Sequence, residues 1–164
     1  MTILPYCPTW DTAISDLLDQ SMGSGRYART AERLREHNHK IDEACFVMLD
    51  EADHLRASIS FWPLLIGDVP ALLLGPLAVR PVDQGKGYGQ TLMAHALSVI
   101  DERMPQPVLL VGDEPYYRRA GFGVISEQVS LPGPVDRERL LVRSHQIPAS
   151  EFHGRVVPAS YLLT

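Results

Sequence analysis

One segment, residues 72–90, constrains the fold of this chain more than any other. It begins with an apolar run from Leu72 to Val79, continues through a glycine-rich turn at residues 84–89, and opens a helix at about Tyr88. A strand, a glycine turn and a helix N-terminus together favour anion binding. Glycine lets successive backbone N–H groups point inward, and the helix end adds partial positive charge. The segment therefore predicts a site for a phosphate compound.

The spacing of the glycines narrows the choice of phosphate compound. A dinucleotide fingerprint requires G-x-G-x-x-G, but the sixth position counted from Gly85 is Gln90. A nucleoside-triphosphate loop requires G-x-x-x-x-G-K followed by Ser or Thr, and no such string occurs in the sequence. The turn itself reads Gln84-Gly-Lys-Gly-Tyr-Gly89, a Q-x-x-G-x-G pattern. A nucleotide-binding domain is therefore disfavoured.

The Q-x-x-G-x-G pattern resembles the GCN5-related N-acetyltransferase (GNAT) superfamily. In that family the pattern follows the fourth strand and binds the pyrophosphate of acetyl-CoA. The segment Tyr117-Arg-Arg-Ala-Gly-Phe122 matches the family's Y-x-x-x-G-F at the expected distance. Gly75-Pro-Leu-Ala-Val79 together with residues 112–122 resembles the bacterial YhbS-like subgroup more narrowly. The resemblance is strong over residues 72–123.

The resemblance implies an α/β fold of the acyl-CoA N-acyltransferase type. Its central mixed sheet has a bulged fourth strand that splays from the fifth, and helices flank the sheet. The length of 164 residues predicts a single domain over residues 1–164. The implied cosubstrate is acetyl-CoA, and no metal is implied. The residues that the resemblance assigns to acetyl-CoA are Leu77, Ala78, Val79, Gln84, Gly85, Lys86, Gly87, Tyr88 and Gly89.

Pro76 lies inside the predicted fourth strand, where it removes a backbone donor from the ladder. Because Gly75 precedes it, the pair indicates a bulge. In the family, this bulge exposes backbone groups that can pair with the pantetheine amides, here those of Leu77, Ala78 and Val79. An edge strand with its proline towards solvent is the alternative, although the surrounding run is too apolar for an edge.

Amine acetylation requires a neutral amine, a polarised carbonyl and a proton for the leaving thiolate. The backbone N–H of Leu77 or Ala78 can polarise the carbonyl. The resemblance assigns proton donation to Tyr117, near the CoA sulfur, with the adjacent Tyr116 as second candidate. The alternative for Tyr117 is packing plus a hydrogen bond, with no proton transfer.

The general base is open at the level of the sequence. Many relatives carry a glutamate on the fourth strand, where Gly75 and Pro76 stand here. The asparagine that the family has after the fifth strand is also replaced, by Gly112 and Asp113. Asp113 or Glu114 can accept a proton directly or through water; alternatively, each caps the short helix that follows.

Polar side chains of the turn and of the segment after Tyr117 also have two interpretations each. Lys86 pairs with a CoA phosphate or is a solvated charge. Gln84 directs its amide at the pyrophosphate or caps the turn. For Arg118 and Arg119, a solvated helix face is favoured over contact with the CoA phosphates.

Composition excludes several other classes. The net charge of −5 argues against a surface for nucleic acid as the main function. The longest apolar runs are about eight residues, too short to span a bilayer, so no membrane partner is expected. The N-terminus lacks the pattern of a secretory signal, which predicts a cytoplasmic protein. Both a monomer and a homodimer fit the sequence.

Hydrophobic periodicity predicts the remaining elements. Helices are expected near residues 11–22, 29–37, 88–103 and 115–121. Strands are expected at 44–49, 55–62, 71–79 and 108–111, with further pieces at 123–130 and 140–143. Alternation of apolar and polar residues from Leu55 to Trp62 predicts a half-buried strand. The order strand, helix, strand over residues 71–111 predicts parallel pairing.

The sequence thus favours an N-acetyltransferase that moves acetyl from acetyl-CoA to an amine of a small molecule or peptide by direct attack. The identity of the amine is open, because fold and family do not transfer a substrate. The alternative is a non-catalytic acyl-CoA-binding sensor or regulatory domain that retains the cofactor cleft and lacks a base.

Overall fold

A computed structural model of the chain describes residues 1–23 and 29–159. They divide into two compact units. Unit 1 contains Lys40–Phe61, Gly75–Met104 and the described part of Met1–Ala28. Unit 2 contains Arg29–His39, Trp62–Leu74 and the described part of Pro105–Thr164. Strands β3 (Leu55–Ile66) and β4 (Val69–Val79) each run through both units, so each unit has one part of both strands.

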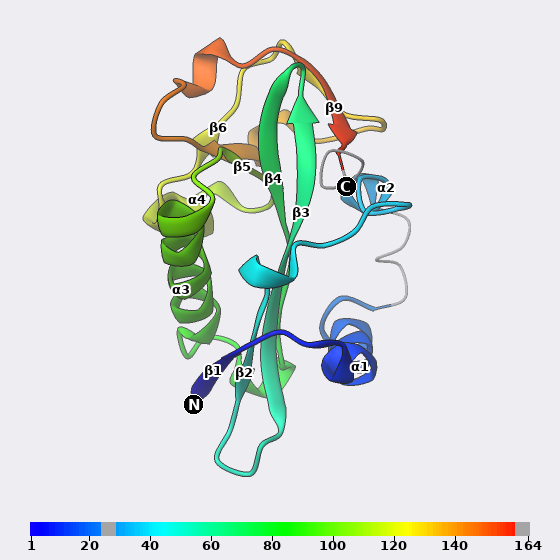
Figure 1. Ribbon diagram of the computed structural model, residues 1–164, viewed down its shortest axis with the longest axis vertical. Helices are drawn as coiled ribbons and strands as arrows, with labels where there is room; N and C mark the ends of the chain where they lie inside the picture. Colours follow the sequence, from blue (N-terminus) through cyan, green and yellow to red (C-terminus); the bar gives the residue numbers. More distant parts are fainter. Residues whose placement is uncertain (24–28, 160–164) are drawn as a thin grey trace. The chain divides into compact units, whose positions relative to one another are not determined.

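Unit 1 is built on antiparallel strands with a helix on each face (Figure 1). Strand β1 pairs with β2, and β2 pairs with the first part of β3. Helix α1 packs Ile14, Leu17 and Leu18 against apolar side chains of β2, β3 and β4, and α3 contacts β2. The elements are β1 (Thr2–Pro5), η1 (Pro8–Trp10), α1 (Asp11–Met22), η3 (Asp42–Ala44), β2 (Phe46–Leu49), η4 (Pro81–Asp83) and α3 (Tyr88–Arg103).

Unit 2 contains the parallel pair of the sheet. Strand β4 pairs parallel with β5, β5 pairs antiparallel with β8, and β8 with β6. Strand β9 pairs antiparallel with the end of β3 and parallel with β7. The elements are α2 (Thr30–Arg33), β5 (Val108–Val111), α4 (Glu114–Tyr117), η5 (Arg118–Ala120), β6 (Gly123–Val124), β7 (Val129–Ser130), η6 (Arg137–Arg139), β8 (Leu140–Arg143), η7 (Ala149–Glu151) and β9 (Gly154–Pro158).

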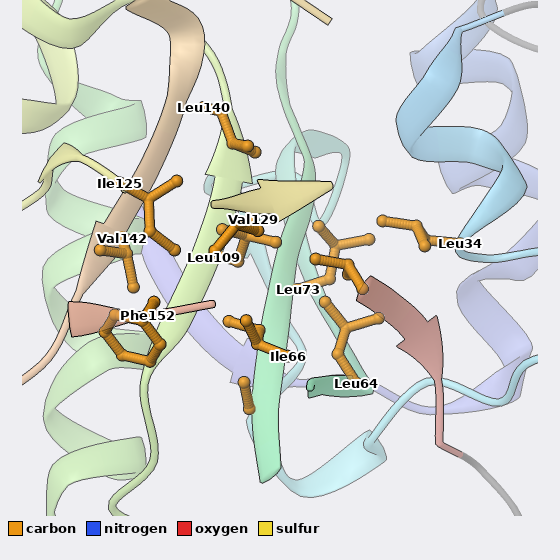
Figure 2. Close-up of a cluster of buried hydrophobic side chains, with 12 residues drawn as sticks. Leu34, Leu64, Ile66, Leu73, Leu109, Ile125, Val129, Leu140, Val142 and Phe152 are labelled. Atoms are coloured by element: carbon orange, nitrogen blue, oxygen red, sulfur yellow. The ribbon is translucent and has the colours of Figure 1, made fainter. Parts of the chain in front are cut away.

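The core of unit 2 is formed by side chains from many short segments (Figure 2). Leu73 and Leu109 come from the parallel strands, Leu140 and Val142 from β8, and Phe152 from the loop before β9. All five are at most 3% exposed. These contacts join residues far apart in the sequence, which is why the C-terminal third folds although its own strands are short.

The structure confirms the predicted mixed α/β architecture. Helix α3 begins at Tyr88 and ends at Arg103, and β5 spans residues 108–111, as expected. The pairing of β4 with β5 is parallel. Strand β4 lies between β3 and β5 in the strand order, so the alternative of an edge strand is wrong.

Two local predictions are wrong. The helix expected over residues 29–37 is limited to Thr30–Arg33. After Arg33 the backbone tightens, with the N–H groups of Leu34 and Arg35 donating to the carbonyls of Ala31 and Glu32, three residues back. A helix through residue 37 is prevented because His37 takes a positive φ of 58°. Strand β3 is not half-buried either, since Ser58 and Ser60 are 2% and 6% exposed. Serine is small enough that both faces of the strand are covered.

Whether the two units fold as one domain is a prediction that the two tryptophans can test. Trp10 belongs to unit 1 and Trp62 to unit 2. We expect the Trp10→Phe and Trp62→Phe variants each to give the same urea midpoint by tryptophan fluorescence and by circular dichroism, because one cooperative domain gives coincident transitions. Fluorescence and circular dichroism midpoints that differ within one of these variants would contradict a single domain.

Candidate functional site

The second half of β4 is irregular where the sequence predicts a bulge. Gly75 has a φ of +138°, a conformation that favours glycine, and a cis peptide bond joins it to Pro76. In the part of the chain that the structure describes, the register with β5 covers Leu72↔Val108 and Leu73↔Leu109 only. Leu77 and Val79 are half-buried and Ala78 is buried in unit 1. The ladder to β5 thus covers positions before the irregularity.

The glycine turn has the backbone conformation of an anion cradle. Gly85 and Gly87 have φ values of +83° and +85°, and Gly87 is the N-cap of α3. A Cβ atom added to either glycine would meet no atom within 4 Å, so the turn faces open space. The first N–H groups of a helix have no intrahelical acceptor. Space, conformation and the N-terminus of α3 together fit a phosphate group.

The two polar side chains of the turn have partners within unit 1. The Gln84 amide donates to the carbonyl of Val79 at 3.2 Å, which joins the turn to the end of β4. The Lys86 ammonium lies 3.5 Å from Oδ1 of Asp83, and its side chain is 55% exposed. Lys86 is therefore free enough to turn towards a bound anion, whereas Gln84 holds the turn.

A residue that the sequence analysis did not single out lies under the turn. Asp83 is only 3% exposed and accepts hydrogen bonds from the Arg56 guanidinium at 2.7 and 3.1 Å. These bonds lower the pKa of the Asp83 carboxyl, so it is ionised at neutral pH. Two features of the sequence could have indicated this pair: Arg56 is the single charged residue of β3, and Asp83 stands next to the glycine motif.

Tyr117 is held tightly within unit 2. Its ring lies against Gly112, where a Cβ atom would be 2.4 Å from Cε2 of the tyrosine. Edge-to-face contacts with Tyr116 and Phe122 fix the ring further, at centroid distances of 4.9 and 5.9 Å. Burial raises the pKa of Tyr117 to about 12, and the nearby Tyr116 and Asp113 add to this. The phenol is therefore protonated at neutral pH.

Both candidate bases are engaged in ion pairs. The Asp113 carboxylate pairs with Arg139 and the Glu114 carboxylate with Arg118. Asp113 occupies the N-cap position of α4, but its side chain makes no capping hydrogen bond, so that expectation is wrong for its carboxylate. The hydrogen bonds from Arg118 lower the pKa of Glu114. This lowered pKa makes the Glu114 carboxylate a weaker base.

The predicted site residues therefore fall into two groups. Unit 1 brings together the second half of β4, the glycine turn and the start of α3. Tyr117, Tyr116 and the two carboxylates lie in unit 2.

Among residues 1–23 and 29–159, no group of three or more His, Cys, Asp or Glu side chains is placed to hold a metal ion. No helix of those two ranges has the length and apolar character needed to cross a membrane.

Comparisons with known proteins agree with this geometry. The model of the Acetyltransferase (GNAT) family matches residues 12–122, about two thirds of the chain. A search of curated proteins finds no match. Among solved structures, the GNAT family N-acetyltransferase YhbS from Escherichia coli, in complex with CoA, has a similar fold. Its TM-score is 0.77 at 22% sequence identity, over 99% of this chain and 92% of that chain.

Two further structures show the same fold. A GNAT family acetyltransferase from Brucella melitensis, in complex with acetyl-CoA, gives a TM-score of 0.61 at 23% identity, over 88% of this chain and 96% of that one. An acetyltransferase of the GNAT family from Staphylococcus aureus gives 0.62 at 14% identity, over 87% and 97%.

The fold and the strand–turn–helix unit define an acyltransferase. More narrowly, the chain belongs to the acetyltransferase (GNAT) family, and its fold is similar to that of YhbS.

Proposed function

We propose that this chain transfers the acetyl group of acetyl-CoA to an amine of a small molecule or peptide by direct attack, with Tyr117 as general acid. The observation that carries the proposal is the glycine turn. Its two left-handed glycines face open space directly before the N-terminus of α3. Two structural neighbours contain CoA and acetyl-CoA, which supports the same ligand here.

The chain's own residues fit the two ends of this cosubstrate. The N–H groups of the turn, residues 84–89, would hold the pyrophosphate, and the exposed Lys86 would add a positive charge. Backbone groups of Leu77, Ala78 and Val79 would pair with the amides of the pantetheine arm. The N–H of Leu77 or Ala78 would also polarise the thioester carbonyl.

The bound thioester supplies an activated acetyl group, and the protein supplies orientation and a proton. The neutral amine of the acceptor attacks the carbonyl carbon, so that a C–N bond forms as the C–S bond breaks, and the nitrogen loses a proton to solvent. Tyr117 donates its phenolic proton to the leaving sulfur and is reprotonated from solvent. The phenol of Tyr117 is protonated at neutral pH, but its raised pKa makes it a weaker acid than a free tyrosine. Support for this role comes from the match of Tyr117-Arg-Arg-Ala-Gly-Phe122 to the family pattern.

One observation favours the second candidate, an acyl-CoA-binding sensor. Asp113 and Glu114, the carboxylates that could serve as general base, are both paired with arginines. A sensor would retain the glycine turn and bind the ligand without turnover. A cytoplasmic location and a monomeric or homodimeric state stay predictions from the sequence under either function.

We expect CoA and acetyl-CoA to bind in the micromolar range and to raise the melting temperature, because a ligand that binds only the native state stabilises it. Differential scanning fluorimetry with CoA, and with ATP as control, measures this directly. A thiol-release assay with polyamines, aminoglycosides, amino acids and peptide N-termini then tests turnover. A folded sample that shows no thermal shift at millimolar CoA would refute the whole proposal, and binding with no release over the panel would favour the sensor.

A further inference from the structure

A negative charge directly before the glycine turn opposes the proposed ligand of the turn. Asp83 stands two residues before Gly85, and its carboxylate is ionised and almost completely buried. A negative charge so close to the turn repels a pyrophosphate, and the repulsion is screened little because the carboxylate is shielded from water. Unless it is neutralised, Asp83 would weaken the binding that the backbone of the turn favours.

Arg56 supplies the compensating charge from a distant part of the sequence. Its Nε and Nη2 atoms donate to the two oxygens of Asp83 at 2.7 and 3.1 Å, a bidentate geometry that fixes both side chains. The opposite edge of the guanidinium faces Asp50, with Nη1 3.6 Å from its Oδ2. Asp50 in turn accepts backbone hydrogen bonds from Ala52 and His54, both at 2.9 Å. Arg56 is thus held from two sides.

The same end of β3 also holds the start of the turn through the backbone. The N–H of Arg80 donates to the carbonyl of Arg56 at 2.9 Å, and the Arg80 guanidinium donates to the carbonyl of Leu55 at 2.7 Å. Both ends of the segment from Arg80 to Asp83, which leads into the glycines, are therefore fastened to Leu55 and Arg56. The position of the turn depends on this anchor.

We infer that Arg56 is a positioning residue for the phosphate end of acetyl-CoA: it fixes the glycine turn on β3 and cancels the charge of Asp83, which leaves Lys86 for the ligand. The inference rests on the proposed function. Through Arg56, β3 would contribute to cosubstrate binding without contacting the ligand. Lys86, at 3.5 Å from Asp83 and with a single carboxylate oxygen in reach, is the weaker partner of that aspartate.

If Arg56 acts by cancelling the charge of Asp83, substitutions of the two residues should have unequal effects on CoA affinity. A purely structural ion pair would instead give equal effects. Arg56→Gln leaves the Asp83 carboxylate with Lys86 as its remaining partner, at 3.5 Å. We expect this variant to weaken CoA binding about tenfold to a hundredfold, mainly through electrostatic repulsion of the phosphates. Asp83→Asn removes the repulsive charge and should change CoA affinity no more than about threefold. The double variant should bind CoA at least about fivefold more tightly than Arg56→Gln alone.

Isothermal titration calorimetry with CoA and with pantetheine, which lacks phosphates, measures these effects. Arg137→Gln is the matched control, because Arg137 also donates two hydrogen bonds, at 2.6 Å each, to the carbonyls of Val129 and Ser126 in unit 2. It should lower the melting temperature and leave CoA affinity unchanged. Under the inference, Arg56→Gln lowers the affinity for CoA and leaves that for pantetheine unchanged.

Equal losses in Arg56→Gln and Asp83→Asn, with no recovery in the double variant, would overturn the inference and leave a structural ion pair. If Arg56→Gln does not fold, the double variant, which has no unpaired buried charge, is compared with Asp83→Asn. Equal CoA affinities of those two variants support charge cancellation, and a further tenfold loss in the double variant overturns it. The wild type is measured first: without CoA binding there, the proposed function fails and this inference fails with it.

Discussion

Replacing Gly87 by glutamate is expected to abolish CoA binding while the fold survives. Gly87 is the N-cap of α3 with a φ of +85°, and the space around its missing side chain is empty to 4 Å. A glutamate there would extend into the space that the pyrophosphate needs and would add negative charge at the positive end of the helix. The strain of a left-handed non-glycine residue costs only ~1–2 kcal/mol, which a folded domain can absorb.

Two control variants separate ligand exclusion from backbone strain. Gly23 at the C-cap of α1 has a φ of +74° and a ψ of 173°, a conformation that is essentially restricted to glycine, and a Cβ atom added there would also meet no atom within 4 Å. Gly23→Glu therefore introduces the same charge with a backbone strain at least as large as that at Gly87. It should bind CoA like the wild type. Gly87→Gln has the size of glutamate without the charge and should retain weak binding. Calorimetry and circular dichroism on the same samples decide the matter, and near-normal CoA binding by Gly87→Glu would show that the turn has no part in binding.

The strand, turn and helix around Gly87 could be predicted from the sequence because every step has a local cause. The apolar run ends at Val79, before Arg80 and Pro81, and glycines permit the positive φ values of the turn. Leu92, Met93, Ala96 and Ile100 then repeat at helical spacing. The whole unit is contiguous in the chain. No distant residue is needed to specify the secondary structure of this unit, although Arg56 and Leu55 fix the position of the turn.

Features that depend on distant partners were not predicted. The Arg56–Asp83 pair joins residues 27 apart, and nothing in either local sequence requires the other. Strand β1 is only four residues long and mostly exposed, so it lacks an alternating pattern. Strand β9 forms because the end of β3 and strand β7 both pair with it. It begins with Gly154 and ends with Pro158, two residue types that usually indicate loops.

Gly112 illustrates how a departure from a family pattern can be explained by packing. The resemblance places Gly112 and Asp113 near the point where relatives have an asparagine. The structure gives the reason in this chain: the ring of Tyr117 occupies the place of a side chain at Gly112. Position 112 therefore contributes no polar side chain to the site, and its glycine makes room for the ring of Tyr117, the proposed acid.

Tyr117→Phe is expected to lower the acetylation rate about tenfold to a thousandfold, since loss of one positioned proton donor costs about 10²–10⁴-fold and water can partly replace it. Acetyl-CoA affinity should change little, because phenylalanine retains the packing against Gly112, Tyr116 and Phe122. The measurement is kcat and KM with an amine accepted in the thiol-release screen. Tyr116→Phe is the matched control, and we expect its kcat to stay within about twofold of wild type, as for a surface change away from the chemistry.

The pH dependence distinguishes proton donation from packing. A general acid works in its protonated form, so the rate that depends on it is lost as the pH rises through its pKa. Because burial raises the pKa of Tyr117 from 10.0 to about 12, the fall in the wild-type rate should begin only above pH 10.0. The slow Tyr117→Phe variant should show no such fall. Gly112→Ala, whose methyl group displaces the ring, should reduce kcat in the same direction. Wild-type turnover by Tyr117→Phe, with a loss in Tyr116→Phe, would transfer the acid role to Tyr116.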